Sequence, residues 1–244
     1  MVLMEELTSK EFDEYRDDHT VVIIPVGALE EHGDHLPLST DTLQPVHIVQ
    51  RIEKELEGRV KVLIAPTVPY GMIQSTLNFP GSMSLTFDTL RELLFEIMFG
   101  MAKNDIRHIV VLSGHAGRSH MMAMKLAAHR LLAMDEYRNL RIMVLSDYDI
   151  AYDKFASDFP KDDGHGGELE TSRVLAIRPD LVKGPGIPTK LEMPPYRVTN
   201  EAQNYFPTGI WGDPTPATAK KGNRANELIV VELARLIEEM VNEA

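Results

Sequence analysis

The chain contains no cysteine among its 244 residues, and this absence excludes several kinds of site. Without cysteine there is no disulfide scaffold, no thiolate-bound zinc, no iron–sulfur cluster and no thiol nucleophile. Any metal site must therefore be built from histidine and carboxylate side chains. Basic residues are also scarce, because 25 Lys and Arg face 37 Asp and Glu, for a formal net charge of −12. That acidity argues against a general role in binding nucleic acid.

The sequence also lacks a segment suited to cross a membrane. Its start, MVLMEELTSKEF, has acids where a signal peptide needs basic residues and then an apolar run. The longest uncharged stretch, 62–87, has 26 residues, but its prolines and glycines break a helix, and Gln74 and Asn78 would be stranded in lipid. We therefore expect a strand and a long neutral loop there, in a cytoplasmic protein.

Strand-like and helix-like segments alternate over residues 1–150. Short continuous β-branched runs are typical of strands buried on both faces. Such runs predict strands at 20–26, 60–65, 108–113 and 141–145. Apolar residues at helical spacing predict helices at 41–56, 88–103 and 119–137. Strands that alternate with helices pair in parallel through right-handed crossovers, so we expect a layered α/β sheet.

The second part of the chain is less regular. We expect an acidic, glycine-rich loop at 154–167, a helix at 168–177 and a C-terminal helix at 217–242. Between these helices, residues 184–216 hold seven of the fifteen prolines, which predicts an extended arm. No shift in composition marks a boundary, so we expect one domain over residues 1–244.

Histidine and acidic residues are concentrated just after the predicted strands: Glu30, His32 and Asp41 follow the first, and His115 follows the third. Ligands of open parallel sheets bind beyond the carboxyl ends of the strands. Glu30 and His32 are two apart and can face one cavity. Asp41 begins a predicted helix, where it caps the helix, bridges two cations, or does both. Zinc, manganese and iron accept this mixture of ligands.

A second group of polar residues lies at 163–170 and includes His165, Glu168 and Glu170. We interpret Glu170 as an acid on the surface of the predicted helix 168–177. We interpret His120, on another predicted helix, as partly exposed, which is the ordinary state of a histidine on a surface helix.

The segment GALEEHGDHLPLSTD, residues 27–41, resembles the signature of the creatininase family of metal-dependent amidohydrolases. Further blocks are similar to family motifs and occur in the same order: FPGSMSL (79–85), SGHAGRS (113–119), HGGELETS (165–172) and GIWGDPTPAT (209–218). These blocks extend from residue 27 to residue 218, which is nearly the whole chain. The resemblance implies a three-layer αβα sandwich with a central, mostly parallel sheet.

The resemblance also implies two divalent metal ions per chain, with zinc as the first choice and manganese or iron as alternatives. Carried onto this chain, the pattern gives the first metal three ligands: Glu30, Asp41 and His115. It gives the second metal His32 and Asp41, so that Asp41 bridges. The enzyme that names the family supplies a further Glu where this chain has Gly117. We predict that Glu168 takes its place, as both a ligand and a catalytic residue.

The implied reaction is hydrolysis of a non-peptide, in some cases cyclic, carbon–nitrogen amide bond of a small molecule by a hydroxide that bridges the metals. Divalent metals lower the pKa of bound water from about 15.7 to about 7. By analogy, His165 supplies or relays the proton that the departing nitrogen needs, and His35 orients a ligand. Three alternatives stay open: a formamide deformylase on a ribosylaminopyrimidine phosphate of flavin or deazaflavin synthesis, a peptidase of a modified peptide, and a metal-depleted binding protein.

Two departures from the family concern the substrate. Creatinine is enclosed by tryptophans in the family, and this chain has only Trp211. In the block around His115, Arg118 replaces the usual Asn, and an arginine near a helix N-terminus would suit a carboxylate or phosphate. These departures argue against creatinine. We predict that Arg118, Trp211 and Tyr148 bind the substrate, and the resemblance implies a homo-oligomer, a hexamer.

Overall fold

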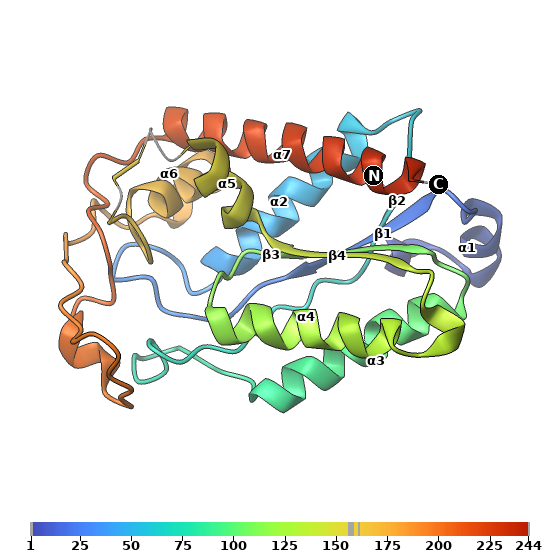
Figure 1. The fold of residues 1–244 in the computed structure, drawn as a ribbon. Helices are drawn as coiled ribbons and strands as arrows, with labels where there is room; N and C mark the ends of the chain where they lie inside the picture. The colour runs from blue at the N-terminus through green and yellow to red at the C-terminus, as the bar shows by residue number, and fades with distance from the viewer. Residues whose placement is uncertain (1, 156–158, 161, 244) are drawn as a thin grey trace.

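The computed structural model describes residues 2–155, 159–160 and 162–243, and within them a four-stranded parallel sheet forms the centre of the molecule (Figure 1). Its strands are β1 (Thr20–Val26), β2 (Lys61–Ile64), β3 (His108–Ser113) and β4 (Arg141–Ser146), in the order β2-β1-β3-β4. All three strand pairs are parallel. The predicted α/β sandwich is confirmed.

Helices surround the sheet and alternate with its strands. The α-helices are α1 (Ser9–Tyr15), α2 (Thr40–Glu55), α3 (Phe87–Lys103), α4 (Arg118–Leu132), α5 (Asp147–Phe155), α6 (Glu168–Ile177) and α7 (Ala219–Asn242). Four short 3-10 helices are η1 (Met4–Glu6), η2 (Asp135–Tyr137), η3 (Pro179–Leu181) and η4 (Ala202–Tyr205) among the described residues. The predicted helix 119–137 is too long, because Met134 is extended (ψ 126°) between α4 and η2. Helix α5 was not expected.

The two faces of the sheet pack against different helices. Val22 and Ile24 of β1 point into a core shared with α3 and α4, whereas Val21 and Ile23 point into a core shared with α2, α6 and α7. Figure 1 shows these helices on opposite sides of the strands. Alternate residues of a strand face opposite sides, so burial of both faces explains the continuous apolar runs.

Pro25 lies in the central strand β1, where a proline is unusual because it has no N–H for a neighbouring strand. The chain accepts it because β2 ends at Ile64, which pairs with Ile23. Beyond that point Val68 N–H donates to the Pro25 carbonyl at 2.9 Å, on the side where the Pro25 nitrogen faces. The chain after β2 thus stays hydrogen-bonded to β1 through Val68, at the end of the sheet that carries the histidines.

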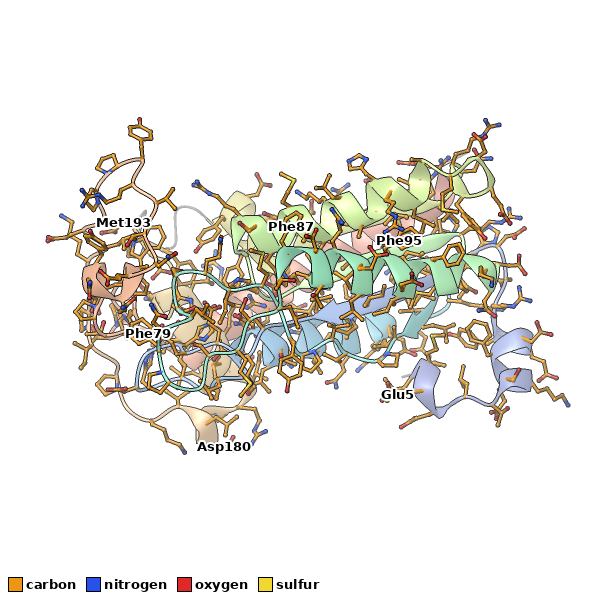
Figure 2. All side chains as sticks on the ribbon, turned by 90° about the horizontal axis from the view of Figure 1, so that it is seen from below. Glu5, Phe79, Phe87, Phe95, Asp180 and Met193 are labelled. Atoms are coloured by element: carbon orange, nitrogen blue, oxygen red, sulfur yellow. The ribbon has the colours of Figure 1, made fainter. Side chains whose placement is uncertain are left out.

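The uncharged stretch forms β2 and a long loop, as expected, and the proline-rich arm lies near that loop. Figure 2 places Met193 of the arm and Phe79 of the loop at one end of the molecule, with Glu5 at the other. The predicted acidic loop 154–167 includes residues 156–158 and 161, which lie outside the described residues. In the part that is described, no helix is both long and apolar enough to span a membrane.

Candidate metal centre

The loop after β1 directs Glu30 and His32 into one buried cluster. Glu30 is 2% exposed and His32 is fully buried. The Nδ1 atom of His32 lies 3.0 Å from the Glu30 carbonyl oxygen. A carbonyl can only accept, so Nδ1 carries the proton and Nε2 keeps its lone pair in the neutral ring. That Nε2 atom is 3.1 Å from Asp41 Oδ1 and 3.5 Å from Glu170 Oε2. The lone pair of Nε2 and the two carboxylate oxygens could therefore bind one metal ion together.

Asp41 lies in the first turn of α2 and turns each carboxylate oxygen toward a different histidine. Its Oδ1 is 3.1 Å from His32 Nε2, and its Oδ2 is 3.2 Å from His115 Nδ1. Oδ2 has no hydrogen-bond partner among the described residues. Of the roles that the sequence left open, this geometry favours a bridge between two cations over a helix cap.

Two glycines allow the main chain to place Asp41 there. A Cβ atom at Gly114 would lie 2.1 Å from the Asp41 carbonyl oxygen. A Cβ atom at Gly27 would lie 2.2 Å from Thr42 Oγ1. Contacts under 3.0 Å do not occur for real Cβ atoms, so any side chain at either position would push the start of α2 away from β1 and β3.

His115 lies in the turn between β3 and α4, with Nδ1 2.9 Å from Glu30 Oε2. Ser113 Oγ holds this turn, because it accepts the His115 N–H at 3.0 Å and donates to the His115 carbonyl at 2.8 Å. His120 supports Ser113 from below: its Nδ1 accepts the Met72 N–H, so its Nε2–H donates to Ser113 Oγ at 3.0 Å. Burial, with the charge of His115, lowers the pKa of His120 to about 3. The expectation of a partly exposed His120 is wrong.

The acid that completes the cluster is Glu170, and Glu168 lies elsewhere. Glu168 pairs with Lys221 of α7. Residues two apart on a helix point about 200° apart, so Glu168 and Glu170 cannot face one site together. Glu170 is 5% exposed, which makes its interpretation as a surface acid wrong. The predicted role of Glu168 as a ligand does not agree with this geometry.

Two hydrogen bonds hold the Glu170 carboxylate in place. The Tyr148 hydroxyl donates to Oε1 at 2.6 Å, and the Gly166 N–H donates to Oε2 at 2.6 Å. The other histidine of this region, His35, donates from Nε2 to Thr171 Oγ1 at 2.8 Å, next to Glu170 on α6. Burial, followed by the charge of His32, lowers the pKa of His35 to about 4. His35 therefore contacts the helix that carries Glu170.

The charges in the cluster stabilise one another against burial. Burial alone would raise the pKa of Asp41, but His32 and His115 hold it well below its usual range. Burial would likewise raise the pKa of Glu170, and His32 outweighs it. Conversely, burial lowers the pKa of His32 and His115, but the facing carboxylates raise both well above the ordinary value. Anionic oxygens and imidazole nitrogens are thus packed together, and each stabilises the charge of the other.

This donor set fits divalent metal ions. Three groups of side chains bring possible ligand atoms within 4.8 Å of one another: Glu30, Asp41 and His115; His32, Asp41 and Glu170; and Glu30, His32 and His165. Among the described residues, Glu30 Oε2 and Asp41 Oδ2 are buried oxygens without a hydrogen bond, and they face His115 Nδ1 at 2.9 and 3.2 Å. Carboxylate oxygen together with imidazole nitrogen suits zinc and manganese.

His165 lies against His32, with the two ring centroids 4.2 Å apart. Its Nε2 atom is 2.7 Å from the Glu31 carbonyl oxygen, so Nε2 carries a proton and Nδ1 is the basic atom of the ring. Burial and the charge of His32 lower the pKa of His165, but Glu30 and Glu31 outweigh them and raise it above the usual value. The side chain is 20% exposed and lines the adjoining cavity.

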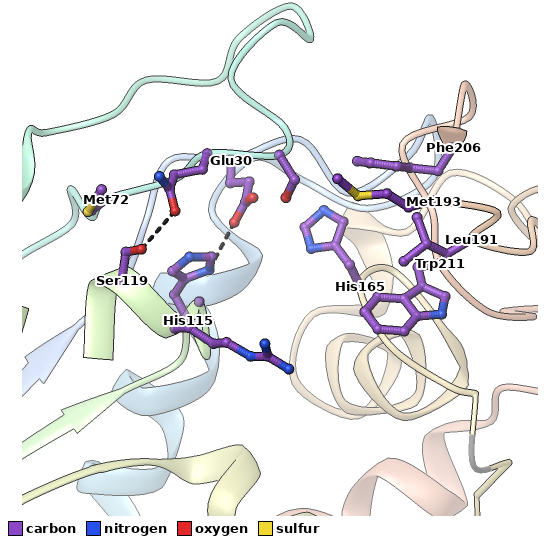
Figure 3. A pocket seen from close by; sticks show the side chains of 13 residues that line it. Glu30, Met72, His115, Ser119, His165, Leu191, Met193, Phe206 and Trp211 are labelled. Carbon is purple, nitrogen blue, oxygen red and sulfur yellow. Dashed lines mark hydrogen bonds and ion pairs between the residues drawn. The ribbon is translucent and has the colours of Figure 1, made fainter. Parts of the chain in front are cut away.

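Arg118 and Trp211 line that cavity, which has a volume of about 410 Å³ (Figure 3). Tyr148 lines a neighbouring cavity of about 250 Å³ together with Asp41 and Glu170. Tyr148 is only 6% exposed and its hydroxyl donates to Glu170, so it lines that cavity with little of its surface and contacts the cluster directly.

One further contact has no signal in the sequence. The hydroxyl of Thr76, from the neutral loop, donates to Glu30 Oε1. Glu170, by contrast, had a signal in the spacing of two acids in the 165–172 block, although the spacing did not tell which acid faces inward.

Comparison with known proteins identifies relatives over almost the full length. The creatininase family model, described as creatinine amidohydrolase, matches residues 5–237. The creatinine amidohydrolase of Pseudomonas putida is 29% identical over 249 residues, covering 95% of this chain and 92% of that protein. The mycofactocin precursor peptide peptidase of Mycolicibacterium smegmatis is 33% identical over 212 residues, covering 84% of this chain and 78% of that protein.

Solved structures agree with this result. The crystal structure of creatinine amidohydrolase (creatininase) superposes with a TM-score of 0.86 at 28% identity, covering 100% of this chain and 99% of that chain. Two further creatininase structures are described by their metals: a manganese form (TM-score 0.85, 27% identity, 99% of both chains) and a variant of Zn-Zn type (TM-score 0.83, 27% identity, 99% and 98%).

Proposed function

The chain belongs to the creatininase family, hydrolases of carbon–nitrogen bonds, and on this premise we propose that it hydrolyses an amide bond of a small molecule with two divalent metal ions. The observation that carries the proposal is the carboxylate of Asp41, whose two oxygens face two different histidines. A bridging carboxylate is the part that a two-metal hydrolase needs and a binding protein does not.

The proposed ligand sets follow from the same contacts. Glu30, Asp41 and His115 would hold the first ion, and His32, Asp41 and Glu170 the second. Glu170 thus takes the role that we first assigned to Glu168. We propose zinc or manganese, because related structures are described with these metals and the donor set suits both.

The chemistry that two divalent cations supply when bound is Lewis-acid polarisation of a carbonyl and of water. The chain itself supplies proton transfer. The Glu31 carbonyl keeps the His165 Nε2 proton in place, so Nδ1 is the atom that takes a proton from water. When the carbon–nitrogen bond breaks, the same Nδ1 atom returns that proton to the departing nitrogen, which leaves as a neutral amine.

The proposal specifies the substrate only as a small-molecule amide. Relatives at similar identity are named for creatinine and for a peptide precursor, so identity alone does not choose between them. The assignment of residues 1–244 to one domain and the homo-oligomeric state remain predictions.

Metal analysis of the purified chain tests the proposal. After loading with zinc or manganese and removal of excess metal, we expect two ions per chain. We also expect turnover in a panel of cyclic amides, formamides and short amidated peptides. Fewer than one ion per chain, with no gain on adding either metal, would favour the metal-depleted binding protein that Gly117 suggests.

A further inference from the structure

The cavity beside the candidate metal centre has two sides of different chemistry. Figure 3 shows the apolar side chains of Leu191, Met193, Phe206 and Trp211 beside His165, away from His115 and Ser119. Its volume of about 410 Å³ lies within the range of small-molecule sites. A ligand that fills it therefore meets an apolar surface from the arm on one side and the start of α4 on the other.

Arg118 brings positive charge to the α4 side of this cavity. Within the described residues it makes no hydrogen bond or ion pair, whereas Arg130 pairs with Glu92 and Arg173 with Asp147. Its neighbour Ser119 already donates to Gln74 at 2.8 Å, so these two polar groups satisfy each other. In a chain with a net charge of −12, an arginine that lines a cavity without a carboxylate partner is available for an anionic ligand.

The start of α4 adds to this charge. Gly117, its N-cap, provides no side-chain hydrogen bond, and the first turn holds no acidic residue. No side-chain cap and no acidic residue of the first turn of α4 therefore offsets the partial positive charge of this helix terminus. Glu30, a candidate metal ligand, lies at the floor of the cavity. Arg118 thus offers an anionic group a place to the side of the metal centre, and the amide is left to face the floor.

We propose that the substrate is an amide that also carries an anionic group, a carboxylate or a phosphate ester, bound by Arg118, and an apolar group that packs against Phe206 and Trp211. This inference rests on the proposed function, because it assigns a substrate class to that site. The guanidinium group matches both anions through paired N–H donors, so the two share one recognition chemistry.

Three matched probes test the inference by calorimetric titration of the metal-loaded chain: benzoate, phenyl phosphate and the neutral benzyl alcohol. We expect the chain to bind at least one anion more tightly than benzyl alcohol. Arg118→Gln is expected to weaken that anion about tenfold and to leave benzyl alcohol unchanged, with a smaller loss in Arg118→Lys. Arg138→Gln, near the opposite ends of the strands, is the control and should bind all probes as the unmodified chain does.

The outcomes separate the two proposals. Preference for phenyl phosphate identifies a phosphate ester, and preference for benzoate identifies a carboxylate. Equal anion affinity in Arg118→Gln and the unmodified chain overturns the inference, as it would if the anions bind the metal ions alone. Absence of anion binding to the unmodified chain also overturns it. Failure of the proposed function is seen separately, as absence of bound metal in the unmodified chain.

Discussion

The floor of the cavity and its apolar wall are built in opposite ways. At the floor, Glu30 lines the cavity, and His32 and Asp41 are packed with it in the candidate metal centre; all three are at most 2% exposed and bound to one another or to the main chain. The wall comes from the arm, where Trp211 is 42% exposed and its side chain packs on Gly164. Groups that are buried and mutually bonded cannot shift without loss of several contacts, whereas a wall residue can change at local cost. The comparison suggests that reaction rate depends on the floor and substrate choice on the wall.

The largest effect is expected from Asp41→Asn. An amide cannot supply two anionic oxygens, so both metal ions should be lost and activity should fall by more than about a thousandfold. Plasma mass spectrometry of the dialysed protein measures the metal content. Asp34→Asn, which changes an exposed acid in the loop before α2, is the control and should retain both ions. Two tightly bound ions in Asp41→Asn would show that the floor is not a shared site.

His165→Gln is expected to separate proton transfer from metal binding. If Nδ1 moves the proton, kcat should fall by about 10²- to 10⁴-fold while the metal content stays the same. His165 also belongs to one of the three possible ligand groups, so loss of an ion would instead identify it as a ligand. His129→Gln, exposed on α4, serves as the control.

Tyr148→Phe tests whether the hydrogen bond from Tyr148 to Glu170 contributes to metal affinity. Removal of the hydroxyl leaves Glu170 Oε1 without its 2.6 Å donor, and we expect about 10- to 100-fold weaker affinity for one metal ion with the other unchanged. Two-step metal titration resolves the two ions. Tyr152→Phe removes a hydroxyl whose contact, with the Asp163 carbonyl, is 3.5 Å long, and should leave both affinities unchanged. Equal weakening of both ions would mean that Tyr148 acts on the whole fold.

The smallest effect is expected from the wall. Trp211→Ala should raise KM about tenfold or less and leave kcat and metal content unchanged, because the ring supplies only apolar contact. Its backbone N–H, which donates to the His165 carbonyl at 2.7 Å, is retained in the variant. Trp211→Phe is expected to restore most of the affinity. A fall in kcat in Trp211→Ala would contradict the separation of floor and wall.

The sheet was predictable from the sequence because burial on both faces leaves an uninterrupted pattern. The β-branched runs at 20–26 and 108–113 became β1 and β3 with the predicted bounds. Helix α5 was not predictable in the same way, since it is a short helix rich in acids, and the contacts of Tyr148 and Ala151 with the core come from distant parts of the chain. The pattern of apolar residues within a segment indicates which of its faces is buried. It does not indicate which distant residues will pack against a short helix and stabilise it.

Within the site, the sequence could locate candidate metal ligands that follow strands but could not choose between Glu168 and Glu170. That choice depends on how α6 is rotated about its axis. Its rotation is set by contact with α7, where Gly222 lies so close to Ser172 that a Cβ atom would be 1.8 Å from the Ser172 carbonyl oxygen. This contact joins residues roughly fifty positions apart in the chain, so the pattern within either helix cannot predict it.

The close approach of Gly27 and Gly114 to the start of α2 has a consequence for the tolerance of the site to change. The separation between His32 and His115 depends on the close contact of Gly27 and Gly114 with the first turn of α2. Such close backbone contacts are far less compressible than contacts between flexible side chains. Descendants of this sequence that keep both glycines would therefore inherit the same interatomic dimensions, however much their arms diverge. Laboratory evolution toward a new amide can begin at the arm with the catalytic dimensions already held constant.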